Sequence, residues 1–133
     1  MLLDTSTCVD LMRETARNQH GPARRAVEKL GDTRLYISLF SVCELNTGVA
    51  LAGRRGEEQR RVSTLTQHLT VLYPDTAFAV LYGEAAAALL AAGTPIPTMD
   101  LLIGTTAKCY GLPVLTRDPV HFAAIPGLVV ERY

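Results

Sequence analysis

Four acidic side chains stand where strands are expected to end or helices to begin. They are Asp4, Glu44, Asp100 and Asp118. They come from distant parts of the chain, and in an α/β fold such positions converge at the carboxyl edge of the sheet. Carboxylates gathered there repel one another unless a hard cation such as Mg²⁺ or Mn²⁺ offsets their charge. The pattern therefore favours a metal-dependent phosphodiesterase.

Each acid also has an ordinary structural explanation. Asp4 can cap the first helix, and Ser41-x-x-Glu44 fits a capping box in which Glu44 reaches back to the Ser41 amide. Asp100 lies in the first turn of a helix, where a carboxylate gains from the macrodipole. Asp118 precedes a proline and can start a turn. Helix caps would fall at both edges of a sheet, whereas these acids share one, so the set as a whole favours a functional centre.

Alternating apolar and helical segments must position these side chains. Strands are expected at 1–3, 35–39, 71–73 and 113–115, with a fifth at the sheet edge at 128–130. Helices are expected from Thr5 onward, at 24–30, from Ser41 to 52, through Leu65 and Leu69 after a solvated turn at 54–61, from Asp75 to 93, and from Thr98 to 111. The pattern predicts a single α/β domain over residues 1–133. Its fold is a three-layer α/β/α sandwich with a central, mostly parallel sheet of four to five strands.

Composition limits the function classes. The chain has 133 residues, 48% of them hydrophobic and 20% charged, with a formal net charge of zero. A chain of this size and apolar content can bury a substantial core. Tight nonspecific wrapping of nucleic acid needs a broad basic surface, which a neutral chain lacks. A local basic cleft is compatible with this balance.

Cysteines and apolar runs indicate the compartment. Cys8, Cys43 and Cys109 form no CxxC pair, so we expect small buried apolar groups and neither a zinc site nor a disulfide framework. No apolar run reaches membrane-spanning length, and the start lacks the regions of a signal peptide. A soluble, cytoplasmic protein with no membrane partner is expected.

Several segments carry a more specific signal. They are Leu2-Leu3-Asp4-Thr5-Ser6, 37–45 (ISLFSVCEL), 95–103 (PIPTMDLLI), 111–122 (GLPVLTRDPVHF) and 126–128 (PGL). In order and spacing they resemble the PIN-domain family, and specifically the VapC-type toxins of bacterial toxin–antitoxin pairs. The resemblance covers essentially the whole chain. The chain departs from it at Gly104-Thr105-Thr106, where alanines are more usual. We interpret that difference as a change in packing.

The resemblance implies a PIN-like fold and a Mg²⁺- or Mn²⁺-dependent endoribonuclease that inhibits translation and growth. It implies an acidic quartet at Asp4, Glu44, Asp100 and Asp118, supported by the hydroxyls of Thr116 and Thr5. We expect Asp4, Asp100 and Asp118 nearest the metal. Glu44 is expected to bind through water or to act as a base. No histidine is required, and His121 is expected to be a packed structural residue.

Partners follow from the same resemblance. They are an RNA substrate, a cognate VapB-type antitoxin and a second copy of the chain. Arg117, Arg13 and Arg17 are candidate RNA-binding residues near the acidic edge, although arginines at such spacings also serve as ordinary solvated or paired side chains. The small residues Ala85–Ala88 favour close helix packing, either between copies or within the chain.

Two other classes of function remain open. An aspartate-based phosphatase would need a second Asp two residues after the first, where this chain has Ser6, and a lysine near the cleft. A PIN-like or receiver-like binding module would not need all four acids. A metal titration with a generic RNA substrate separates these classes from the nuclease.

Overall fold

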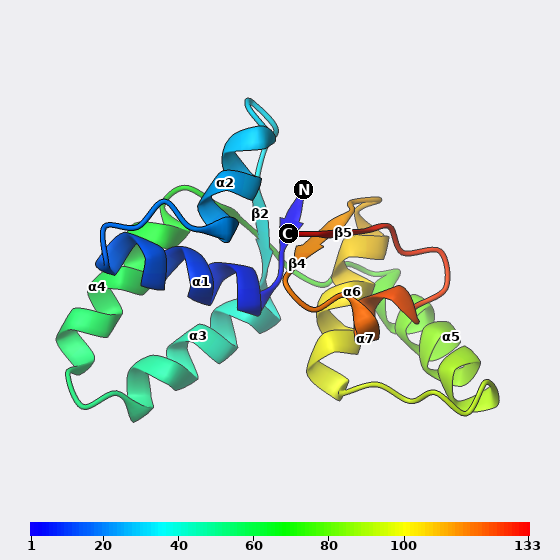
Figure 1. Ribbon diagram of the computed structural model, residues 1–133. Coiled ribbons are helices and arrows are strands. Elements are labelled where there is room, and N and C mark those ends of the chain that lie inside the picture. Colours follow the sequence, from blue (N-terminus) through cyan, green and yellow to red (C-terminus); the bar gives the residue numbers. More distant parts are fainter.

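Five short strands form an entirely parallel sheet in the order β3-β2-β1-β4-β5 in the computed structural model, which describes residues 1–133 (Figure 1). The strands are β1 (Leu2–Leu3), β2 (Tyr36–Ser38), β3 (Thr70–Leu72), β4 (Val114–Thr116) and β5 (Val130–Arg132). β1 is central, so the first residues of the chain lie between two neighbours. The expected α/β class is confirmed, and the sheet has the larger of the two predicted strand numbers.

Helices cover both faces of this sheet (Figure 1). One layer contains α1 (Thr5–Ala16), α2 (Pro22–Lys29), α3 (Leu39–Leu51) and α4 (Arg55–Thr66). The other contains α5 (Phe78–Ala91), α6 (Thr98–Cys109) and α7 (Val120–Ala123). The predicted three-layer sandwich is therefore confirmed. No helix has the length and apolar character needed to cross a membrane.

Side-chain alternation along the strands divides the core in two. Leu3 and Leu115 pack with the α1–α4 layer, whereas their neighbours Leu2 and Val114 pack with the α5–α7 layer. Successive strand side chains point to opposite faces, so each apolar pair serves both layers. The continuous apolar runs that predicted buried strands reflect this two-sided burial.

Strand register sets the geometry at the carboxyl edge. Leu3 is level with Ile37 on β2 and with Leu115 on β4. The next residue along β1 is Asp4, and the next along β4 is Thr116, so these two side chains emerge beside each other. α1 begins directly after Asp4, and α3 begins directly after β2.

Several predicted boundaries are wrong. α3 begins at Leu39, with Ser38 as its cap, rather than at Ser41. The charged segment at 54–61, expected as a turn, is largely the first half of α4, where Arg61 pairs with Glu57 and Glu58. Such i,i+3 and i,i+4 pairs support a helix that has few apolar residues.

The later helices differ from the prediction as well. Asp75 accepts a hydrogen bond from the Ala77 amide in a turn, and α5 starts only at Phe78. Thr98, expected as the cap of α6, is instead its first residue, and Pro97 takes the cap position. α7 was not predicted, because four residues are too few to show helical periodicity.

A buried carboxylate joins the first two helices. Glu14 on α1 accepts hydrogen bonds from the amides of Ala23 at 3.0 Å and Arg24 at 2.9 Å. These amides lie in the first turn of α2, whose own cap, Gly21, has no side chain. A Cβ at Gly21 would lie 2.2 Å from the Glu14 carboxyl carbon, so glycine leaves space for this capping contact.

Candidate active site

Asp4 is the buried centre of the acidic edge, with 5% of its surface exposed. Its carboxylate accepts hydrogen bonds from the Thr7 amide at 2.8 Å and from the Ser6, Thr7 and Thr116 hydroxyls. Asp4 therefore caps α1, as one of its two sequence interpretations predicted. It also lies at the carboxyl end of β1. Several donors compensate the charge of a carboxylate that burial alone would disfavour.

The thiol of Cys8 lies one turn beyond the Asp4 cap and is buried. Burial, and secondly the negative charge of Asp4, raises the pKa of this thiol well above its ordinary value. Cys8 therefore contributes a neutral apolar group to the core, as predicted. The same prediction is wrong for Cys43, which is exposed on α3, and Cys109 is half-buried.

Thr116 links Asp4 to Asp118. Its hydroxyl donates to Asp4 Oδ2 at 2.8 Å and accepts from the Asp118 amide at 3.1 Å. Asp118 is exposed, and its Oδ1 accepts a hydrogen bond from the Val120 amide at 3.4 Å. The predicted turn at Asp118 is thus present, and Thr116 joins the Asp118 backbone amide to the Asp4 carboxylate.

Glu44 is held by the next side chain after Asp4. The Thr5 hydroxyl donates a hydrogen bond to Glu44 Oε2. The capping-box explanation of Glu44 is wrong, because Ser38 caps α3 and its hydroxyl accepts from the Ser41 amide at 2.9 Å. Glu44 lies in the second turn of α3, and its carboxylate points toward Thr5 at the start of α1.

Asp100 lies in the first turn of α6 and contacts a histidine. Its Oδ2 is 2.6 Å from Nδ1 of His121 on α7. The expectation of a packed structural histidine is wrong, because 45% of the His121 side chain is exposed. Its neighbour Phe122 fills the core position instead.

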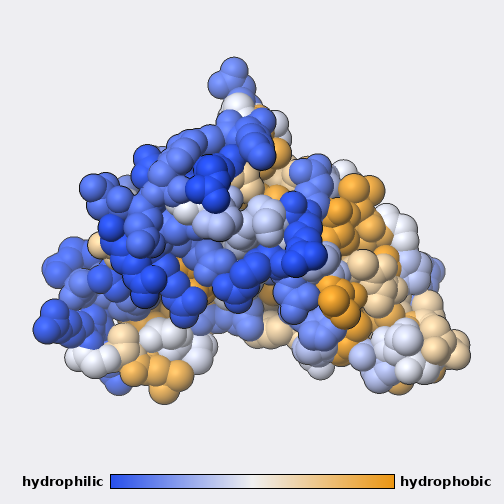
Figure 2. Space-filling model, in the orientation of Figure 1, coloured by the Kyte–Doolittle hydropathy of each residue, from blue (hydrophilic) through white to orange (hydrophobic).

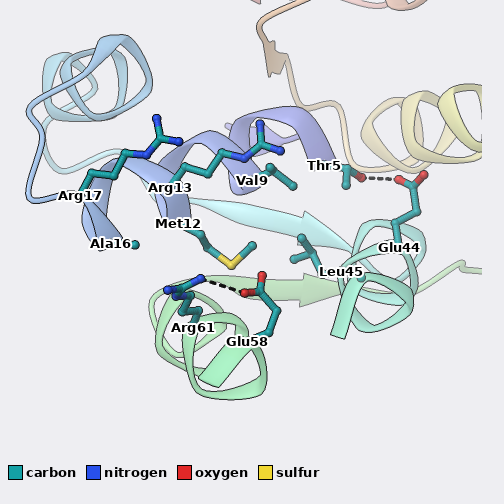
Figure 3. Close-up of a pocket in the computed structure, with 11 residues that line it drawn as sticks. Thr5, Val9, Met12, Arg13, Ala16, Arg17, Glu44, Leu45, Glu58 and Arg61 are labelled. Carbon is teal, nitrogen blue, oxygen red and sulfur yellow. Dashed lines mark hydrogen bonds and ion pairs between the residues drawn. The ribbon is translucent and has the colours of Figure 1, made fainter. Parts of the chain in front are cut away.

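A groove of about 490 Å³ extends from Glu44 along α1. Figure 3 shows Thr5 and Glu44 at one end, Arg13 and Arg17 on the α1 side, and Arg61 with Glu58 on the α4 side. Met12 and Leu45 form part of its floor. The groove therefore combines an acidic end, arginine walls and an apolar base.

Arg117 is held by Asp10, an acid outside the four candidate site residues. Its Nη1 lies 3.0 Å from both carboxylate oxygens of Asp10 on α1. The hydroxyl of Tyr133 donates to Asp10 Oδ2 at 3.1 Å, and Arg13 lies 3.8 Å from Oδ1. Burial, which is the largest cause, raises the pKa of Tyr133, so this phenol remains a donor. One network thus connects α1, the segment after β4 and residue 133.

Residues 1–128 match the family model of the PIN domain. The chain belongs to the PIN-domain family. It is homologous to VapC toxins, with 31% identity over 132 residues to the tRNA(fMet)-specific endonuclease VapC of Salmonella typhimurium, covering 99% of this chain and 96% of that one. Identity to ribonuclease VapC1 of Haemophilus influenzae (strain R2866) is 28%, over 96% and 92% of the two chains.

A solved structure agrees with this assignment. The fold matches a chain in the DNA-bound VapBC structure from Salmonella typhimurium with a TM-score of 0.87. Sequence identity is 29%, and the match covers 98% of this chain and 96% of that chain. The resemblance noted in the sequence motifs is confirmed.

A divalent metal is implied by the PIN family, and the oxygen donors at the edge suit a hard cation. No three or more His, Cys, Asp or Glu side chains lie in one group able to hold a metal ion. Asp4, Asp100 and Asp118 were expected to converge on one point, and in the structure they do not form a preassembled metal site. Mg²⁺ usually keeps several waters and binds one or two carboxylates, so the donor set remains compatible with it.

Three of the four acids are each held by a hydrogen bond to a different neighbouring side chain. Hydrogen bonds connect Asp4 to Thr116, Glu44 to Thr5 and Asp100 to His121. Nothing in the sequence singled out Asp10, and His121 was assigned to the core. For His121 the sequence offered only its position just before the core residue Phe122. For Asp10 it offered only its place on the same helix as Arg13. Neither signal points to a partner without the tertiary structure.

Proposed function

We propose that this VapC-type PIN ribonuclease hydrolyses RNA phosphodiester bonds at the edge formed by Asp4, Glu44, Asp100 and Asp118, with Mg²⁺ or Mn²⁺ as cofactor. The observation that carries the proposal is the buried, hydrogen-bonded carboxylate of Asp4 at the end of the central strand, linked by Thr116 to the Asp118 amide. A bound divalent cation offsets charge on the phosphate and acidifies a water.

Each acid has its own role in this proposal. Asp4, Asp100 and Asp118 are the candidates for the one or two carboxylates that would bind the cation directly, with water completing its shell. Asp4 is the most rigid of the three, because hydroxyl and amide donors orient it. Glu44, oriented by Thr5, holds a water or accepts its proton. Ser6 donates to Asp4 and leaves no acid in the position that a phosphatase would need.

The arginines are proposed to guide the RNA backbone. Arg13 and Arg17 line the groove that begins at Glu44. Arg117 uses one nitrogen for Asp10, which leaves its other donors for a phosphate at the rim. Positive charge beside the acidic edge gives a neutral chain the local attraction that an anionic substrate requires.

An Asp100→Asn variant tests the nuclease proposal. Cleavage of a panel of RNAs should fall by more than roughly 100-fold, because even the loss of a residue that only supports a metal ligand typically costs 10–100-fold. The panel includes initiator tRNA, because the Salmonella relative is named a tRNA(fMet)-specific endonuclease. Asp32→Asn, the same change in an exposed turn, should leave cleavage unchanged. Chelation should abolish activity, and Mg²⁺ or Mn²⁺ should restore it. Full activity of Asp100→Asn would reject the site.

A VapB-type antitoxin is the proposed partner. A second groove of about 440 Å³ between α1 and α4 adjoins the first, and Met12, Ala16 and Arg61 line both. An amphipathic segment suits such a surface, with its apolar side on Met12 and Leu65 and its acidic groups on the arginines. A basic residue of that segment would then pair with the acidic edge and compete with the cation.

Inhibition measurements at varied Mg²⁺ test this contact. The antitoxin should inhibit less at high Mg²⁺, and less when its cleft-directed basic residue is changed to alanine. A Leu65→Glu variant should weaken the complex, whereas Leu51→Glu, on the exposed end of α3, should not. Inhibition that is independent of Mg²⁺ and of the basic residue would contradict direct occlusion of the acidic edge.

A further inference from the structure

His121 is the only side chain that hydrogen-bonds to Asp100. The Nδ1 atom lies 2.6 Å from Oδ2, and the two side chains are 45% and 28% exposed. Asp4, by contrast, has hydroxyl donors on several sides. We infer that His121 is a positioning residue, whose Nδ1–H donates to Asp100 and orients its carboxylate for the reaction. This inference rests on the proposed ribonuclease function.

Close packing of α7 against α6 creates this contact. Gly104 lies one helical turn after Asp100, and a Cβ there would stand 2.3 Å from Ile125 Cδ1 and 3.5 Å from Phe122 Cδ1. The missing side chain therefore lets the segment with Phe122 and Ile125 approach α6. Both of these side chains are buried in the core. His121, immediately before Phe122, is consequently held beside Asp100.

The hydrogen bond has a defined chemical consequence. A carboxylate only accepts, so Nδ1 must carry a hydrogen in this contact. Oδ2 of Asp100 is then engaged, and Oδ1 is left to face a ligand. Carboxylates that bind metals are commonly oriented by such outer hydrogen bonds. His121 moves no proton in this role and does not touch the substrate.

Nuclear magnetic resonance of the free protein tests the geometry without any activity measurement. At about pH 8.5, where an ordinary imidazole is neutral, the ¹⁵N shifts of His121 should report a proton on Nδ1. Asp100→Asn should remove that preference, because an amide does not demand a donor as a carboxylate does. A wild-type His121 with its proton on Nε2 would overturn the inference, whatever the protein's activity proves to be.

Kinetics test the functional part. His121→Ala should lower kcat by roughly 10–100-fold with little change in the KM for RNA. His121→Asn keeps an N–H donor near the Nδ1 position and should recover most of the rate. His20→Ala, at an exposed histidine between α1 and α2, should have no effect.

Two outcomes would contradict a positioning role. An unchanged rate in His121→Ala would show that Asp100 needs no such donor. An equal loss in His121→Ala and His121→Asn would show that the hydrogen bond is not the important feature. Absence of RNA cleavage by the wild-type protein would reject the proposed function, and the ¹⁵N measurement would still decide the contact.

Discussion

Thr116 shows at the residue scale how one hydroxyl links two acids. It is fully buried, donates to Asp4 and accepts from the Asp118 amide. Thr116→Val keeps the shape and removes both contacts. A hydrogen bond to a charged group contributes about 1.5–3 kcal/mol, so the free energy of unfolding should fall by about that amount. Cleavage should fall by roughly 10–100-fold, because Asp4 and Asp118 lose their link.

Thr116→Ser is the matched control. It retains the hydroxyl and loses one methyl group, so cleavage should remain close to wild type, with a stability cost of about 1 kcal/mol for the lost CH₂ group. Chemical denaturation gives the stability change, and steady-state cleavage gives the rate. If valine and serine behave alike, the hydroxyl is not what supports the acidic edge.

At the scale of the elements, Gly104 sets how closely α7 and the residues after it pack on α6. Gly104→Ala should destabilise the fold: overpacking costs about 1–3 kcal/mol, and alanine's better helix propensity returns only about 1 kcal/mol. The steric cost comes from Ile125 Cδ1, 2.3 Å from the added Cβ, on a side chain with 1% exposure and little room to move.

Ile125→Val provides the partner variant, since it deletes Cδ1. Alone it should cost about 0.5–1.5 kcal/mol. In its background Gly104→Ala should become neutral or stabilising, which a double-mutant cycle in urea can measure. Additive effects in that cycle would mean that Gly104 does not serve to accommodate Ile125.

Assembly belongs to the scale of the whole molecule. Hydrophilic side chains cover the α1, α2 and α4 side, whereas apolar ones gather over the α5–α7 half (Figure 2). Glu84 is the one charged residue of α5, and Val80 and Leu90 are exposed on that helix. The alanine stretch serves two purposes, because Ala85 is buried in the core and Ala87 and Ala88 face outward.

We therefore propose a homodimer through the outer face of α5, because an exposed helix this apolar is typical of an interface. Light scattering at micromolar concentration should give a dimer mass for the wild type and a monomer mass for Leu90→Glu, whose leucine is 69% exposed. Leu51→Glu, at 83% exposure on α3, is the control and should remain dimeric. A monomeric wild type would refute the proposal.

The sequence by itself determined the alternation of strands and helices and a mostly parallel sheet, and it singled out the four acids as candidates. These features depend on local patterns: apolar runs, turn residues and an acid directly after a strand. The PIN family followed from the order of those motifs. Boundaries were less accurate, as at α3, because Ser38 and Ser41 are both competent caps and only the end of β2 selects between them.

Only the tertiary structure decided which side chains meet. Strand order and register place Thr116 beside Asp4, although they are far apart in sequence. The packing of α7 on Gly104 places His121 on Asp100, and the fold brings Asp10 to Arg117. Contacts between distant segments depend on how whole elements pack, and the local preferences of the residues involved do not contain that information.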